Sequence, residues 1–124
     1  MLRALVLVLS AAALLAGCDD EGDGVVFKDP KGEIAVEEGM EFTLELRVNA
    51  SVGYDWVPVA PGRSGPVRLK ATSVDYPNEE SIGDSGFKRF TYEATRTGQG
   101  TIELRRLFRG DPQERRLLIV RVRG

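Results

Sequence analysis

The side chains that could carry out covalent chemistry are almost absent from this chain of 124 residues. It contains no His and a single Cys, Cys18, so Ser-His-Asp and Cys-His nucleophilic sites and zinc sites built on these residues are excluded. The 19 Asp and Glu residues include no pair in a setting that suggests a buried acid and base. We therefore expect no enzymatic activity, no metal and no cofactor, and turn to surfaces that could bind a partner.

Cys18 ends a segment that has the three parts of an export signal. A basic start at Arg3 precedes an apolar run over residues 4–15, which is too short to span a bilayer as a stable helix. The final residues, Leu15-Ala16-Gly17-Cys18, resemble the bacterial lipobox, in which the Cys is lipidated and becomes the new N-terminus. This resemblance implies a lipoprotein signal peptide over residues 1–17 and lipidation at Cys18. The alternative is a free thiol in a plain secreted protein.

A lipidated Cys18 would place the protein in the bacterial cell envelope, on the periplasmic side of the inner or outer membrane or at the cell surface. Residues 18–24 then form a tether rich in Asp, Glu and Gly, which is too polar to pack. Residues 25–124 remain as one domain, large enough for a core without disulfides. Its later strands carry an excess of Arg that fits a solvent-exposed sheet face. Without interleaved exposed aromatic residues, we expect no nucleic-acid partner.

Alternation of apolar and polar residues predicts a domain of short strands. The clearest strand, residues 41–48, places its apolar residues on one face and charge on the other, so we expect one buried and one wet face. The same period or a shorter version of it occurs at residues 25–27, 33–36, 56–59, 67–74, 90–94, 101–104 and 118–122. Gly- and Pro-containing turns separate them at residues 29–32, 38–39, 61–66, 97–100 and 109–112. Seven or eight such strands predict an all-β sandwich.

The strand at residues 41–48 runs into a short stretch of small residues followed by two aromatics, Asn49-Ala50-Ser51-Val52-Gly53-Tyr54-Asp55-Trp56. This stretch resembles the Asn-Pro-Thr-Thr-Gly-Tyr-x-Trp signature of the chagasin family, which are reversible protein inhibitors of papain-like cysteine peptidases. Ala50 replaces the Pro and Val52 replaces the second Thr. The resemblance implies a first inhibitory loop over residues 49–54, in which Ser51 approaches the catalytic centre of the peptidase. Gly53 suits a sharp turn or a close approach to the partner.

Two later segments resemble the other inhibitory loops of that family. Gly83-Asp84-Ser85-Gly86, with Phe90 beyond it, matches the second-loop pattern Gly-x-Gly-Gly, with Ser85 in place of a Gly. The third loop normally begins Arg-Pro-Trp, and here Arg106-Leu107-Phe108 or Arg109-Gly110-Asp111 occupies its place. The resemblance implies that Phe108, assisted by Arg106 or Arg109, replaces the Trp.

Taken over residues 25–122, the resemblance implies an immunoglobulin-like β-sandwich whose three loops form a wedge at one end. In this interpretation the protein is a lipid-anchored, monomeric inhibitor that occludes the cleft of a papain-like cysteine peptidase. The alternative is a non-inhibitory binding module of the envelope that has kept the sandwich. Convergence of Ser51, the second loop and Phe108 at one exposed end favours the inhibitor, whereas a buried Phe108 or splayed loops favour the module. We expect Trp56 in the core, and Tyr54 either in contact with the partner or supporting the loop from behind.

Overall fold

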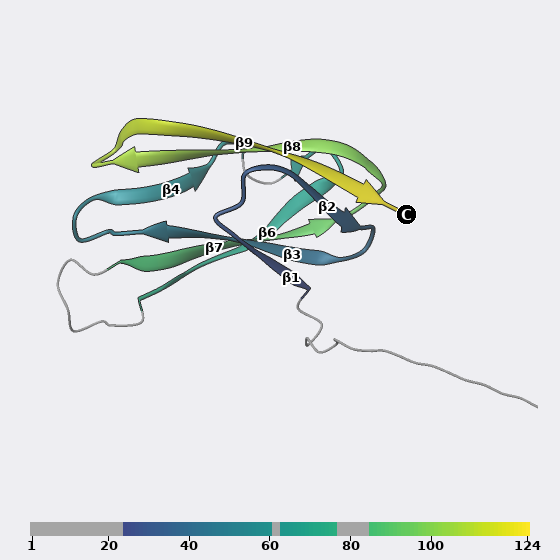
Figure 1. The fold of residues 1–124 in the computed structure, drawn as a ribbon, viewed down its shortest axis with the longest axis horizontal. Coiled ribbons are helices and arrows are strands. Elements are labelled where there is room, and N and C mark those ends of the chain that lie inside the picture. The colour runs from purple at the N-terminus through teal and green to yellow at the C-terminus, as the bar shows by residue number, and fades with distance from the viewer. Residues whose placement is uncertain (1–23, 61–62, 77–84) are drawn as a thin grey trace, which may run out of the picture.

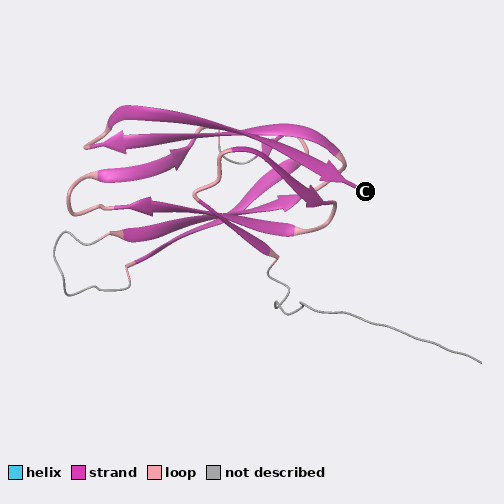
Figure 2. Ribbon diagram, viewed as in Figure 1, coloured by secondary structure: helices cyan, strands magenta, loops and turns pink. Residues whose placement is uncertain are grey.

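The computed structural model describes residues 24–60, 63–76 and 85–124, which form nine strands and no helix (Figures 1 and 2). The strands are β1 (Val25–Lys28), β2 (Gly32–Glu37), β3 (Glu41–Val48), β4 (Tyr54–Pro58), β5 (Arg63–Ser64), β6 (Val67–Asp75), β7 (Gly86–Ala94), β8 (Gly98–Phe108) and β9 (Asp111–Arg123). The predicted signal peptide and Cys18 lie outside the described residues. The described part of the chain contains no helix long and apolar enough to cross a membrane.

The strands form two sheets that pack face to face (Figure 1). The first sheet has the order β1-β3-β7-β6-β5 and the second the order β2-β9-β8-β4. The chain crosses from the first sheet to the second between Lys28 and Gly32, so that β1 pairs in parallel with β3, and β2 pairs in parallel with β9. The predicted immunoglobulin-like β-sandwich is confirmed, and the expected seven or eight strands agree with it, since β5 has only two residues.

Alternating apolar residues on the inner faces of the two sheets make up the core. Phe42 and Tyr92 stack within it, with ring centroids 5.7 Å apart and planes 16° apart. Trp56 is 4% exposed, which confirms the prediction that it is a core residue. Burial of each large apolar side chain contributes about 1.5–3 kcal/mol. The buried apolar cluster of the described residues runs from Ile34 to Val122 and includes residues of both sheets.

Strand β3 confirms the predicted strand at residues 41–48, but the prediction that its outer face is solvent-exposed is wrong at two positions. Thr43 and Glu45 point away from the core, yet each is only 9% exposed. Their cross-strand partners on β7 cover them: Thr43 hydrogen bonds Thr91 at 3.1 Å, and Arg89 donates to Glu45 at 2.9 Å. Burial of these polar groups is tolerated because each has a partner.

The hairpin of β8 and β9 is longer than the sequence pattern predicts. The expected turn at residues 97–100 is already strand from Gly98 onward, and the expected turn at residues 109–112 shortens to Arg109 and Gly110. Both turn residues have positive φ, 52° and 89°, which is typical of two-residue hairpin turns. The extended part of β9 is solvent-exposed, so cross-strand hydrogen bonds rather than burial hold it.

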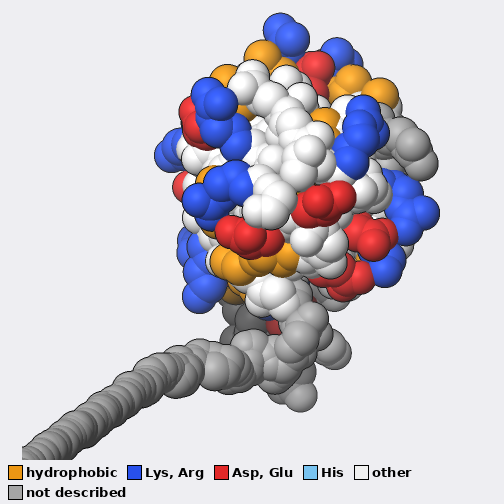
Figure 3. Space-filling model, turned by 90° about the vertical axis from the view of Figure 1, so that its right-hand side faces the viewer, with side chains coloured by type: hydrophobic (Ala, Val, Ile, Leu, Met, Phe, Trp, Pro, Cys, Tyr) orange, Lys and Arg blue, Asp and Glu red, His pale blue; other side chains and the backbone are white. Residues whose placement is uncertain are grey.

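The connections between strands divide into two ends of the sandwich (Figure 1). At one end lie the loop from β3 to β4, the turn from β8 to β9, the end of β6 and the start of β7. We call this the loop end and define it by Asn49–Gly53, Tyr76, Ser85 and Arg109–Gly110. At the opposite end lie the start of β1 and the end of β9. Figure 3 views that opposite end, where acidic and basic side chains are intermixed. The described residues of the three predicted loops therefore share one end of the molecule.

Candidate binding surface at the loop end

The first predicted loop is a compact turn closed by Asn49. The Asn49 N–H donates to the Tyr54 carbonyl at 3.0 Å, and the N–H groups of Gly53 and Tyr54 both donate to the Asn49 carbonyl at 2.9 Å. The Ser51 hydroxyl donates to Asn49 Oδ1 at 2.9 Å. Ser51 and Val52 are exposed at the tip. Hydrogen bonds thus hold this loop in one shape although the Pro of the family signature is missing.

Gly53 joins the first loop to the turn between β8 and β9. The Arg109 N–H donates to the Gly53 carbonyl at 2.8 Å. Gly53 has a φ of 108°, and a Cβ added there would stand 2.7 Å from Cγ of Arg109 and 3.4 Å from its backbone nitrogen. Both the backbone conformation and the close approach therefore require glycine.

An aromatic pair lies behind this junction. Tyr54, which the sequence analysis placed in the first loop, is the first residue of β4 and pairs with Phe108 at the end of β8. Their ring centroids are 4.7 Å apart. The Arg106 guanidinium lies 4.4 Å from the centre of the Tyr54 ring, and that of Arg109 lies 5.1 Å from the centre of the Phe108 ring. Phe108 is half-buried rather than buried, so it remains within reach of a partner.

The second predicted loop is described only at its edges, because Gly83 and Asp84 lie outside the described residues. Ser85 is exposed, and Gly86 is buried at the start of β7. A Cβ at Gly86 would lie 2.4 Å from the ring of Tyr76, so this position needs a residue without a side chain.

Tyr76 ties the second loop to the first. It directly follows β6, and its hydroxyl accepts a hydrogen bond from the Ala50 N–H at 3.0 Å. The sequence analysis did not identify this residue. The only signal for it is a tyrosine at the end of a strand and directly before Pro77, which does not reveal what its hydroxyl contacts.

A cation–carboxylate pair between the sheets positions β4 beside these loops. Lys88 of β7 donates to Asp55 of β4 at 3.1 Å, and its side chain is 14% exposed. Asp55 Oδ1 also accepts a hydrogen bond from the Trp56 N–H at 2.8 Å. Lys88 is largely shielded from solvent whereas the Asp55 side chain is 46% exposed, so this pair joins the two sheets at the edge of the core and is partly screened by solvent.

A groove of about 650 Å³ lies next to the loop end and is lined by residues of both sheets. Its lining includes Asn49 of the first predicted loop and Ser85 of the second, and extends to Trp56 and Arg116. It is an open surface feature that is continuous with the candidate loops.

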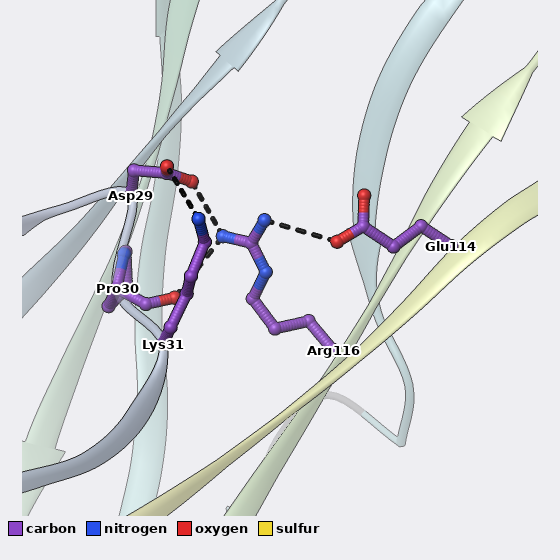
Figure 4. A network of polar contacts seen from close by, with 5 residues as sticks. All are labelled: Asp29, Pro30, Lys31, Glu114 and Arg116. Carbon is purple, nitrogen blue, oxygen red and sulfur yellow. Dashed lines mark hydrogen bonds and ion pairs between the residues drawn. The ribbon is translucent and has the colours of Figure 1, made fainter.

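Arg116 lines this groove and is held in a network of polar contacts (Figure 4). Its guanidinium donates to Asp29 at 2.6 Å, to the Pro30 carbonyl at 3.2 Å and to Glu114 at 3.2 Å. The same group stacks on the Trp56 ring, 4.7 Å from its centre. The hydrogen bond from Arg116 lowers the pKa of the Asp29 carboxyl below its ordinary value of 3.8. No sequence pattern indicated this network, because its members come from three distant segments.

In chemical terms, this surface is suited to binding by shape and by backbone and side-chain contacts. The candidate residues of the first and third loops, together with Ser85 and Gly86, meet at one end. Among the described residues, no cluster of three or more His, Cys, Asp or Glu side chains is arranged to hold a metal ion.

Comparison with known proteins identifies the family and supports the fold. The family model described as chagasin family peptidase inhibitor I42 matches residues 35–120, which confirms the resemblance noted in the sequence. The fold is similar to that of the cysteine protease inhibitor EhICP2 from Entamoeba histolytica, with a TM-score of 0.63 and 15% identity over 81% of this chain and 96% of that one. No curated protein sequence matches the chain.

Two further solved structures share the fold. The solution structure of Amebosin has a TM-score of 0.59 and 22% identity over 82% of this chain and 100% of that one. PbICP-C, whose structure was solved in complex with falcipain-2, has a TM-score of 0.61 and 15% identity over 81% of this chain and 98% of that one. At these identities the likeness shows the sandwich fold.

Proposed function

Since this chain belongs to the chagasin family of peptidase inhibitors, we propose that it is a reversible inhibitor of papain-like cysteine peptidases. In this proposal the loop end enters the active-site cleft and excludes substrate. The similarity in fold to the cysteine protease inhibitor EhICP2 and to PbICP-C, which binds falcipain-2, supports this choice of partner.

The observation that carries the proposal is the linkage of the loops to one another. One hydrogen bond joins the third loop to the first, from the Arg109 N–H to Gly53, and another joins the first loop to the base of the second, from the Ala50 N–H to Tyr76. Loops that are held in their final shape lose little conformational entropy when they bind. A splayed arrangement, as expected for a module that had given up the wedge, would lack these bonds.

The first loop supports inhibition without cleavage. Its main chain turns back on itself through the bonds to the Asn49 carbonyl, so residues 50–53 do not offer the extended strand that a peptidase cleaves. The exposed tip presents Val52, which is 39% exposed, and the small hydroxyl of Ser51. In this proposal the tip covers the catalytic groups and binds by contact alone.

The aromatic anchor of the third loop differs from the family pattern, and we assign its role to Phe108. The Arg-Pro-Trp of the family is absent here, and aromatic anchors often contribute about 2 kcal/mol or more to an interface. Phe108 is braced by Tyr54 on one side and Arg109 on the other, so little side-chain freedom is left to lose on binding.

Lipid anchoring at Cys18 forms part of the proposal. Two or three acyl chains, each contributing about 0.8 kcal/mol per buried methylene, would hold the protein stably at a membrane of the bacterial envelope. The start of β1 lies at the opposite end of the sandwich from the loops (Figure 1), which would leave the loop end accessible to a peptidase.

The proposal is tested with the unlipidated protein of residues 19–124, which contains the whole core. It is titrated against papain and a cathepsin L-type enzyme while hydrolysis of a fluorogenic peptide is followed. We expect reversible, stoichiometric inhibition at nanomolar to low micromolar concentration. The Phe108→Ala variant should inhibit at least tenfold less well, whereas Ile119→Ala, on the outer face of β9, should inhibit as the wild type does. Folded protein that inhibits neither enzyme would reject the inhibitor and favour the binding module.

A further inference from the structure

Three arginines near the loop end stack on aromatic rings and have no carboxylate partner among the described residues. Arg47 lies 5.8 Å from the centre of the Phe87 ring, and Arg106 and Arg109 lie over Tyr54 and Phe108 as given above. No described Asp or Glu comes within 4.0 Å of any of these three guanidinium groups. Most arginines elsewhere have a carboxylate within that distance: Arg68, Arg89, Arg105, Arg115, Arg116, Arg121 and Arg123. The exception among the described side chains is Arg96, between β7 and β8, which donates to the Gly65 carbonyl at 3.2 Å and stacks on no described ring.

Two of the three unpaired arginines, Arg47 and Arg106, line the groove beside the loop end. The carboxylates that line the same groove are already engaged. Asp29 and Glu114 both bind Arg116, and Glu45 binds Arg89. The groove therefore has a surplus of positive charge beside the first loop.

Stacking on a ring fixes the orientation in which each of these guanidinium groups can bind a partner. A guanidinium that lies on an aromatic ring keeps its N–H groups free at the edge, where they match the two oxygens of a carboxylate. The Tyr54 and Phe108 rings lie in contact, so Arg106 and Arg109 share one aromatic platform. Such arginines are partly preorganised, which lowers the entropy lost when each binds a carboxylate.

Charge at the other end of the molecule provides the contrast. There Arg121 pairs with Glu33, and Arg123 pairs with Glu37 at 3.2 Å. Figure 3 shows side chains of both signs intermixed over that end. Apart from Arg96, the arginines without a carboxylate partner among the described residues are thus located beside the surface that we assign to peptidase binding.

We propose that Arg47, Arg106 and Arg109, here called the arginine surface, select peptidases that carry carboxylates on the rim of the active-site cleft. This inference rests on the proposed function and adds the chemistry of the partner. Charge complementarity of this kind acts mainly by steering the encounter and by disfavouring partners of like charge. The arginine surface therefore binds carboxylates on the rim of the peptidase cleft, and these come into contact with it when the loops enter the cleft.

The test compares two triple variants with the same change in net charge. Arg47→Gln, Arg106→Gln and Arg109→Gln together remove the arginine surface, and the control replaces Arg115, Arg121 and Arg123 with Gln in the same way. Association rate constants are measured with a fluorogenic peptide against a papain-like peptidase whose cleft rim is acidic and against one whose rim is basic. Ionic strength is raised from about 20 mM to about 500 mM, which shortens the screening length several-fold.

For the acidic enzyme, we expect the wild-type association rate to fall about tenfold or more with salt, in keeping with electrostatic steering. The arginine-surface variant should bind about tenfold more slowly at low salt and respond little to salt, while the control variant should behave as the wild type does. For the basic enzyme, salt should not slow wild-type association. Arg109→Gln alone, in an exposed turn where it does not affect folding of the core, should slow the low-salt rate about two- to threefold.

The outcomes separate this inference from the proposed function. Wild-type inhibition with no salt dependence, or an equal loss in both triple variants, would overturn the arginine surface and leave the inhibitor intact. Absence of wild-type inhibition at every ionic strength would overturn the proposed function and this inference together. Melting temperatures of all variants show whether a loss of rate is due to loss of fold.

Discussion

Replacement of Gly53 by alanine tests whether inhibition depends on the junction between the first and third loops. At a φ of 108°, a residue with a Cβ costs roughly 1–3 kcal/mol. The new Cβ would also stand 2.7 Å from Cγ of Arg109. The Arg109 side chain can move away, but it then leaves the Phe108 ring, and the hydrogen bond from the Arg109 N–H to Gly53, which contributes about 0.5–1.5 kcal/mol, is weakened.

If binding requires the wild-type junction, the free energy needed to restore it, about 1–3 kcal/mol, is lost from affinity. We therefore expect the inhibition constant of Gly53→Ala to rise roughly 5- to 150-fold. The matched control is Gly39→Ala, at the opposite end of the sandwich, where φ is 86° and a Cβ would meet nothing within 4 Å. This control should lose stability for the same backbone reason, with a drop in melting temperature of about 4–8 °C per kcal/mol, but should inhibit normally.

The assay is a titration of papain with each variant, alongside thermal unfolding. A Gly53→Ala protein that melts at a lower temperature but inhibits as well as the wild type would refute the reasoning, because the junction would then be irrelevant to binding. Equal losses of inhibition in both variants would refute it as well, since the effect would follow from general destabilisation.

Three further predictions address contacts that are visible only in the structure. Tyr76→Phe removes the acceptor for the Ala50 N–H, worth about 0.5–1.5 kcal/mol, and should raise the inhibition constant up to about tenfold, whereas Tyr92→Phe in the core should leave it unchanged in the same titration. Because Arg116 holds the pKa of Asp29 below 3.8, the stability that Asp29 contributes is present above that value and is lost as pH falls through the lowered pKa. The Asp29→Asn variant should therefore lose less stability than the wild type below about pH 4. Acid unfolding is monitored by the fluorescence of Trp56, on which Arg116 stacks. Burial raises the pKa of Tyr92 from 10.0 to about 12, so the stability that Tyr92 contributes is present below pH 10 and is lost as pH rises through 12. The Tyr92→Phe variant should therefore lose stability less steeply than the wild type in an alkaline titration over that range.

The fold could be predicted where burial imposes a local pattern. In β3 the alternation from Phe42 to Val48 gave the strand and its inner face, because every second side chain enters the core. The exposed start of β9, residues 111–115, was missed because hairpin hydrogen bonds hold it and no apolar alternation marks it. The parallel pairs of β1 with β3 and β2 with β9 depend on where the chain crosses between sheets, and no local signal reports that.

The candidate site shows the same division. Gly53 stands out in the sequence because a motif of defined spacing surrounds it, and the structure supplies the reason in its positive φ and its approach to Arg109. Tyr76 and Arg116 could not be predicted, since each contacts residues far away in the chain: Tyr76 bonds Ala50, and Arg116 bonds Asp29. Their roles depend on long-range strand register, which alternation alone does not determine.

The placement of the start of β1 opposite the loop end has a mechanical consequence for an anchored protein. A membrane tether would pull on Val25 while a bound peptidase pulled on the loops, so the load would run along the strands. The hydrogen bonds between β1 and β3 lie across that direction, over four paired positions from Val25 to Lys28. Force applied in this way shears the bonds together instead of unzipping them one by one. If the protein is anchored as proposed, the sandwich would therefore be oriented to withstand tension between membrane and partner along its long axis (Figure 1).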